Sequence, residues 1–509
     1  MRQLAIAALS VLTLSGQDAS KVWKAYQRHE APKLLPWLSE VIRYPTVAGN
    51  ARAWTDQKAW LQARAEELGF PFKDTGPVFE IELPGPAGSP VLGLVVHGDV
   101  QPVDAARWSF PPFAGTVKDG AIIGRGAADD KGPLVQALLA MKALELSGAK
   151  RTHTIRLLVG SDEESGSHDM TAYLKEHEAP DYSLVLDSGF PVVVGEKAWN
   201  ALWVQTAPGE RGGRTEPYTV ESLNAGLSPS IVPDQAKLLL RWKEGAADWA
   251  PLMKALAAKP LPPGTHLQMK ADGDRLEIAT TGKSAHGGVN LEGGRNALMA
   301  LASVLENALP SGGADDLLAF ARQAGRDLYG SGLGLTEQDP LWGRAAVNVA
   351  MAGPSQQIIT MGVPTPGDWS LLINIRTPPP LFGKPLERRM DAQVAAFDTR
   401  TGAKFTAGGY YLDTPLVFDP QAKLIKRLMA DYSRATGEHP APAISGGGTY
   451  AKRLPNSIAF GMWFPDKPYP GHDVDEKVPV ADLERGERVL IEALADLACS
   501  EPIKEPFKP

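Results

Sequence analysis

The sequence predicts an α/β protein with a mainly parallel sheet, interrupted by an inserted α+β domain. Three observations predict it. Short apolar runs alternate with helical segments up to residue 195, which is the pattern of strand–helix–strand units. Between residues 196 and 412 this alternation is replaced by longer strand-like runs, and it returns after residue 412. The length of 509 residues also exceeds what one ordinary hydrophobic core supports.

The first residues have the composition of a secretory signal peptide. Met1-Arg2-Gln3 precedes an apolar run over 4–14, followed by small and polar residues up to Ser20. The run is too short to span a bilayer. We therefore expect residues 1–19 to be a signal peptide and the mature chain to be exported, to the periplasm or the medium, with no membrane partner after signal removal. The alternative is a buried N-terminal helix.

Hydrophobic periodicity predicts the remaining elements. In the discontinuous domain formed by 20–195 and 413–509, we expect helices over 34–42, 54–68, 133–146, 421–436 and 480–497, and strands over 78–83, 91–96, 154–159, 183–186 and 457–462. In the insertion over 196–412, we expect strands over 236–242, 275–279 and 371–376 and helices over 249–257 and 295–308.

Composition excludes several classes of function. The apolar content of 43% and the charged content of 22% are those of a soluble globular protein. The net charge of -7 argues against nucleic acid as a partner. Cys499 is the single cysteine, so an internal disulfide and a thiolate-rich zinc site are both excluded.

Five short segments carry side chains that bind metal ions. Three of them follow predicted parallel strands, whose carboxyl ends meet at one edge of a sheet. Two imidazoles and several carboxylates form the ligand set of a hydrolytic site with two zinc ions. The segments contain His97 with Asp99, Asp129 with Asp130, Glu163 with Glu164, Asp187, and His472.

The spacing within these segments indicates separate roles. Asp99 is placed to accept the second ring N–H of His97, which would fix the tautomer of the ligand. Either Asp129 or Asp130 would bridge the two ions, although an Asp at this position also suits the N-cap of the next helix. Of Glu163 and Glu164, one should bind a metal ion while the other acts as general base, taking a proton from the bridging water.

Further candidates lie in and after the insertion. His286 could donate a hydrogen bond to the developing oxyanion when a lid domain closes. Arg376 could form a bidentate pair with a substrate carboxylate, or a structural salt bridge instead. The backbone N–H groups of Gly446, Gly447 and Gly448 could hold an anionic terminus.

With these motifs the chain resembles the di-zinc metallopeptidase family that includes aminoacylases, succinyl-diaminopimelate desuccinylase, carnosinases and peptidase V-type dipeptidases. The resemblance runs over nearly the whole mature chain. It implies a zinc-peptidase catalytic domain with a lid, and Asp129 as the bridging ligand. It also implies Glu163 as general base and Asp99 as the partner of His97. The implied metal ligands are His97, Asp129, Glu164, Asp187 and His472.

The finer resemblance is to peptidase V-type dipeptidases. It rests on the segments Gly446–Tyr450, Ala285-His286 and Asn374–Arg376, which resemble substrate-site segments and add Thr449 to the candidates, and on Asp187 in place of Glu. Ser230 departs from the pattern, since a polar amide is expected there. The large insertion suggests the monomeric design of these dipeptidases.

We therefore expect a dipeptidase that uses two zinc ions, with manganese or cobalt as possible substitutes, and that acts on short peptides with a free carboxylate. One alternative is an N-acyl-amino-acid amidohydrolase or carboxypeptidase with the same metal site. Another is a peptide-binding domain without activity, which would be expected to have lost ligands or the base.

Overall fold

The computed structural model describes residues 18–207, 212–355, 369–409 and 411–503. Within these ranges the chain forms two compact units. The first lies in Met1–Glu196, Leu416–Gly471 and Asp475–Pro509, and the second in Lys197–Pro415 and His472–Val474. The signal peptide predicted over 1–19 falls outside the described residues except for its last two, and it stays a prediction.

The division of the chain differs from the prediction in three places. Glu196, the first residue of the predicted insertion, belongs to the first unit. Residues 413–415 and 472–474, which we had assigned to the discontinuous domain, pack with the second unit. For the later segment the cause is side-chain pairing, because Ser284 donates a hydrogen bond to Asp473 at 2.9 Å and Lys283 forms an ion pair with it at 3.2 Å. Hydrophobic periodicity contains no signal for such pairing.

The first unit is built on a nine-stranded sheet whose central strands are parallel. Its parallel centre consists of buried, apolar strands, as expected for strands covered on both faces. The predicted mainly parallel sheet is therefore confirmed. Across the sheet the strands are β1 (Phe72–Asp74), β2 (Phe79–Leu83), β6 (Thr154–Gly160), β3 (Val91–His97), β7 (Tyr182–Val185), β21 (Ser457–Ala459), β9 (Val193–Glu196) and β19 (Leu416–Val417), with β20 (Ala443–Ser445) beside β9.

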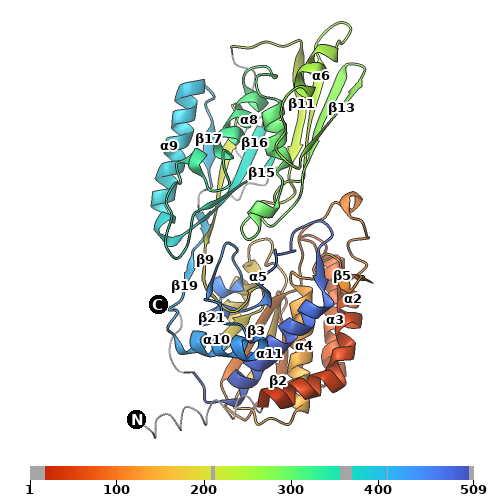
Figure 1. Ribbon diagram of the computed structural model, residues 1–509, viewed down its shortest axis with the longest axis vertical. Helices are drawn as coiled ribbons and strands as arrows, with labels where there is room; N and C mark the ends of the chain where they lie inside the picture. Colours follow the sequence, from red (N-terminus) through yellow and green to blue (C-terminus); the bar gives the residue numbers. More distant parts are fainter. Residues whose placement is uncertain (1–17, 208–211, 356–368, 410, 504–509) are drawn as a thin grey trace. The chain divides into compact units, whose positions relative to one another are not determined.

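The first unit also contains the helices α2 (Leu34–Ile42), α3 (Ala51–Leu68), α4 (Lys131–Leu146), α5 (His168–Glu176), α10 (Lys423–Thr436) and α11 (Val480–Cys499). Helix α4 is buried along most of its length, because it packs against strands β3 and β6 and against helices α2 and α11. Helix α10 packs along α11 (Figure 1). No helix among the described residues is both long enough and apolar enough to cross a bilayer.

Two small sheets lie beside the main one. Strands β4 (Thr116–Lys118), β5 (Ala121–Ile123) and β23 (Lys477–Pro479) pair antiparallel, and β8 (Ser188–Gly189) pairs with β22 (Met462–Trp463). The strand predicted over 457–462 is thus two strands, β21 and β22. Gly461 separates them with φ of 78°, a left-handed conformation that bends the chain and that glycine tolerates best.

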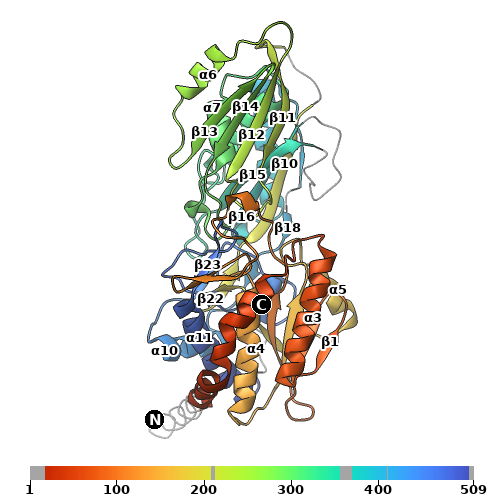
Figure 2. The same ribbon diagram turned by 90° about the vertical axis from the view of Figure 1, so that its right-hand side faces the viewer.

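The second unit is an antiparallel sheet with helices, which confirms the predicted α+β insertion (Figure 2). Helices α7 and α8 pack against four of its strands, β12, β14, β15 and β16, and bury their apolar faces there. The strands are β13 (His266–Asp272), β14 (Arg275–Thr281), β12 (Gln235–Trp242), β11 (Tyr218–Ala225), β15 (Ala346–Pro354), β16 (Trp369–Thr377), β10 (Ala198–Gln205), β17 (Thr406–Gly408) and β18 (Tyr411–Asp413). The helices are α6 (Ala250–Ala257), α7 (Ala297–Val304), α8 (Gly313–Ala324) and α9 (Lys384–Thr401).

Candidate metal centre

Polar side chains gather at the carboxyl edge of the parallel strands. His97 ends β3 and lies opposite Gly160, the last residue of β6. The loop with Glu163 and Glu164 follows β6, and Asp187 follows β7, the other neighbour of β3. Three adjacent strands therefore deliver candidate ligands to one edge, as the sequence predicted.

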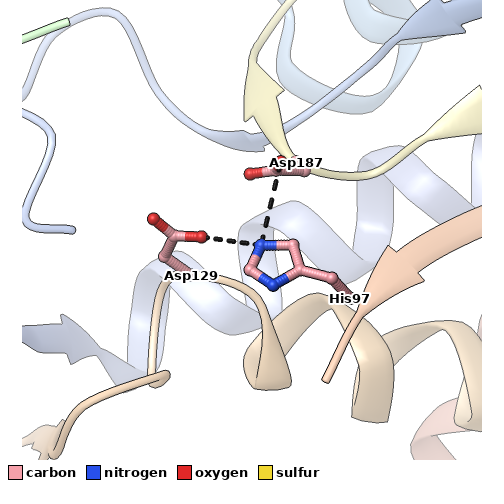
Figure 3. A group of neighbouring side chains, drawn as sticks. All are labelled: His97, Asp129 and Asp187. Carbon is pink, nitrogen blue, oxygen red and sulfur yellow. Dashed lines mark hydrogen bonds and ion pairs between the residues drawn. The ribbon is translucent and has the colours of Figure 1, made fainter. Parts of the chain in front are cut away.

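The His97 ring is fully buried, and each of its nitrogens has a defined environment. Nε2 lies 2.9 Å from Oδ1 of Asp129 and 3.8 Å from Oδ2 of Asp187 (Figure 3). Nδ1 lies 3.0 Å from the carbonyl oxygen of Asp99 and 3.4 Å from its Oδ1. The Nδ1–H group is thus held by Asp99, and Nε2 faces two carboxylates.

This environment favours positive charge at Nε2 of His97. Burial lowers the pKa of the ring, but hydrogen bonds to Asp129 and Asp99 and the charge of Asp187 outweigh it and hold the pKa well above its usual value. A divalent cation next to Nε2 would satisfy the same carboxylates and take the place of that proton. Imidazole nitrogen and carboxylate oxygens without a thiolate form a donor set that suits zinc, and manganese or cobalt as well. The residues present therefore fit a metal ion.

Asp129 is shared between two groups of candidate ligands. Its ligand atoms lie within 4.8 Å of those of His97 and Asp187 in one group and of those of Glu164 in the other. Membership of both groups is what a bridging carboxylate needs.

Asp130 has a different role from the helix cap considered in the sequence. It occupies the N-cap position of α4, but its side chain makes no capping hydrogen bond. Instead, Oδ2 accepts the backbone N–H of His97 at 3.1 Å, so Asp130 fixes the end of β3. The helix-cap interpretation is therefore wrong for the Asp130 side chain.

Asp99 connects His97 to the two glutamates. Its Oδ1 accepts the N–H of Glu163 at 3.2 Å, and its Oδ2 accepts the N–H of Glu164 at 3.1 Å. A residue that the sequence analysis missed, Gln101, donates from Nε2 to Oε2 of Glu164 at 2.8 Å and is itself buried. A single buried amide two positions after Asp99 is too common a pattern to stand out in a sequence.

The Glu163 carboxyl is half-buried beside the cluster. Burial first, and then the negative charge of Asp187, raise its pKa well above the usual value, while His97 acts in the opposite direction. A group with a raised pKa in this position can accept a proton and release it again, as a general base and acid must. A bound cation would lower that pKa.

Two other buried residues of the first unit contact the Asp129 loop and were missed in the sequence. Oε1 of Glu476 accepts the N–H of Ala128 at 2.8 Å, and its Oε2 pairs with Arg125 at 2.6 Å. The sequence offered one signal, since Glu476 follows the His472 motif within a few residues.

His286 and His472 lie together in the second unit. Their rings stack with centroids 4.5 Å apart and planes inclined by 24°. Nδ1 of His286 accepts the N–H groups of Gly288 and Val289, both at 2.9 Å, so the proton of the neutral ring is on Nε2. The ring can therefore act as a donor from Nε2, as the oxyanion hypothesis requires. The roles of His472 and His286 stay predictions.

Arg376 is buried in the second unit at the end of β16. Its Nε donates to Oδ1 of Asn374 at 2.9 Å and its Nη2 to Oγ of Ser230 at 3.3 Å, while the guanidinium lies 5.6 Å from the ring centroid of Trp199. These two oxygens and the aromatic face orient the guanidinium group. Ser230, which departs from the expected amide, is thus a contact of Arg376.

The glycine loop after β20 is held by its own neighbours. Gly447 donates its N–H to Oγ of Ser445 at 2.9 Å. The Thr449 hydroxyl donates to Glu196 at 2.7 Å and accepts the N–H of Ala451 at 3.1 Å. Thr449 thus has a structural role at the start of the turn Tyr450–Lys452. Substrate binding by Gly447, Gly448 and Thr449 stays a prediction.

The chain is similar to known peptidases in sequence and to known dipeptidases in fold. The model of the Peptidase family M20/M25/M40 matches residues 93–496. A Staphylococcus aureus (strain bovine RF122 / ET3-1) protein that bears the name "Putative dipeptidase" is 27% identical over 420 residues, covering 81% of this chain and 84% of that protein. Among solved structures, human carnosine dipeptidase 1 is similar with a TM-score of 0.60 and 14% identity, covering 94% of this chain and 98% of that one. A di-peptidase from Saccharomyces cerevisiae is similar with a TM-score of 0.59, 15% identity and the same coverage.

Proposed function

The chain belongs to peptidase family M20/M25/M40 and is a peptide-bond hydrolase, and from this premise we propose that it is a zinc-dependent dipeptidase. The observation that carries the proposal is the cluster of His97, Asp129 and Asp187 at the carboxyl edge of the parallel sheet. Glu163 lies beside this cluster with a raised pKa. Names of relatives that describe dipeptidases support the choice of short peptides.

We assign the metal ligands as the resemblance implies. His97 and Asp187 would hold one ion, Glu164 and His472 the other, and Asp129 both. When bound, two zinc ions would supply Lewis acidity to the peptide carbonyl and to the attacking water.

The protein groups around the site have distinct tasks. Glu163 takes the proton of the attacking water and delivers it to the leaving amine, which is the task of a general base that turns into an acid. Asp99 holds both His97 and the backbone of Glu163, so the ligand and the base keep a fixed geometry.

The second unit would supply substrate contacts. Arg376 would bind the free carboxylate of the peptide, because a guanidinium can pair bidentately with a carboxylate and Asn374 and Ser230 hold this one in a fixed orientation. His286 donates from Nε2 to the oxyanion that develops at the carbonyl. A requirement for both groups would restrict the enzyme to short peptides with a free carboxyl end. We further propose that it acts as an exported monomer.

Four matched compounds test the proposal with the zinc-loaded protein: a dipeptide, its C-terminal amide, its N-acetyl derivative and a tripeptide that extends it. We expect cleavage of the free dipeptide and loss of cleavage on amidation, because the amide removes the charge that Arg376 binds. Preference for the N-acetyl compound would instead assign the chain to the N-acyl-amino-acid amidohydrolases or carboxypeptidases with the same metal site.

A further inference from the structure

A buried ion pair joins the loop that carries Asp129, between β5 and α4, to a distant segment of the first unit. Arg125 and Glu476 are both almost fully buried, and Nη1 of Arg125 lies 2.6 Å from Oε2 of Glu476. The guanidinium also lies 5.5 Å from the ring centroid of Trp108. The two residues are 351 positions apart in the chain, so the pair joins two distant segments.

The second oxygen of Glu476 contacts the backbone of the metal loop. Oε1 accepts the N–H of Ala128 at 2.8 Å and is 3.4 Å from the N–H of Asp129. Two successive N–H groups therefore converge on one carboxylate oxygen. Because the direction of the Asp129 side chain depends on its backbone, these contacts orient the carboxylate that is shared between the two ligand groups.

The small sheet of β4, β5 and β23 fixes the position of Glu476. Strand β23, which begins at Lys477, pairs with β5, and the Asp129 loop follows β5. The backbone carbonyl of Glu476 accepts the N–H of Gly124 at 2.9 Å. Just before it, Asp475 accepts hydrogen bonds from the N–H and the hydroxyl of Ser109 at 2.8 and 2.7 Å.

Stability alone gives no reason to place a carboxylate at this point. Glu476 is almost fully buried, and removing a carboxylate from water is costly. Replacement of a buried ion pair by apolar side chains of similar size often leaves a protein as stable as before. A carboxylate here is therefore explained better by what it holds, the N–H groups of the metal loop.

On these grounds we propose that Glu476 and Arg125 are positioning residues for the metal centre. Glu476 sets the backbone of Ala128 and Asp129, and Arg125 holds the Glu476 carboxylate in place through the ion pair at 2.6 Å. The inference rests on the proposed function, since it gives the pair its purpose as support for the bridging ligand. It adds two residues that the sequence motifs did not include.

Two variants separate positioning from stability. Arg125→Met/Glu476→Met removes both charges but also the acceptor for the two N–H groups. Glu476→Gln keeps an acceptor oxygen but leaves Arg125 without a counter-charge. If the pair positions Asp129, the double variant should bind zinc about 10- to 100-fold more weakly. It should nevertheless melt no earlier than Glu476→Gln, in which a buried charge is left unpaired. Glu476→Gln should melt earlier and bind zinc nearly as the wild type does.

The measurement is competition between the zinc-free protein and a chromophoric chelator, with thermal unfolding in parallel. The control is Arg427→Met/Asp496→Leu, which removes another ion pair of the first unit, at 2.7 Å between α10 and α11. Wild-type zinc affinity in Arg125→Met/Glu476→Met would overturn the inference, as would an equal loss of affinity in Glu476→Gln. A wild-type protein that binds no zinc would contradict the proposed function itself, and this inference with it.

Discussion

Glu487 makes the stability of the first unit fall as pH rises. Glu487 belongs to α11, and its side chain is completely buried. Among the described residues, no hydrogen bond to either of its carboxylate oxygens is found. Burial raises the pKa of Glu487 well above its ordinary value of 4.5, while the amide of Gln136 acts weakly in the opposite direction. The folded protein therefore keeps this carboxyl protonated over a range of pH in which the unfolded chain ionises it.

The size of the effect follows from proton linkage. Above pH 4.5 the unfolded state binds fewer protons at Glu487 than the folded state, so the free energy of unfolding decreases with pH. The decrease is about 1.4 kcal/mol per pH unit until the folded-state pKa is reached. Glu487→Gln removes the titration but keeps the shape. The variant should therefore gain stability relative to the wild type as the pH rises above 4.5, by at most about 1.4 kcal/mol per pH unit.

The assay is urea unfolding of the metal-free protein, followed by circular dichroism at a series of pH values. Comparison of variant and wild type at each pH cancels the contribution of the other titrating groups. Glu484→Gln, on the exposed side of the same helix, is the control for loss of a carboxylate that is not buried. A stability difference between Glu487→Gln and the wild type that does not change with pH would refute the reasoning.

Two further predictions concern the active site. Glu163→Gln should keep the metal content measured by elemental analysis and reduce kcat by about 10²- to 10⁴-fold, because it removes the proton acceptor and not a ligand; lost metal would mean that Glu163 is a ligand. Arg376→Met should raise KM for a free dipeptide by about 10- to 100-fold, the range for a lost hydrogen bond to a charged group, and leave the inhibition constant of the uncleaved C-terminal amide unchanged. Equal effects of Arg376→Met on both compounds would argue for a structural role of Arg376.

The sequence predicted the elements that depend on local patterns. Buried strands such as β3 and β6 are continuous apolar runs, and helix α2 has the bounds that its periodicity indicates. The placement of His97 and Asp187 followed, since parallel strands present their carboxyl ends at one edge. This part of the site is therefore a consequence of strand order.

Contacts between distant segments could not be predicted. The sequence suggested that the Asp130 side chain caps helix α4, but its carboxylate accepts the backbone N–H of His97 at the end of strand β3. Gln101 bonds to Glu164, 63 positions away, and Glu476 bonds to Ala128, 348 positions away. No periodic pattern in the sequence links either residue to its partner. Likewise, the 472–474 segment packs with the second unit because of polar contacts such as that between Ser284 and Asp473.

The most direct test of the proposed dinuclear site is a zinc titration of the metal-free protein with dipeptide hydrolysis as the readout. The account predicts no hydrolysis without metal and a rise in activity that ends at two zinc ions per chain, with His97→Ala losing at least one of them. Full activity of the metal-free protein, or binding of zinc without any hydrolysis of a dipeptide, would contradict it.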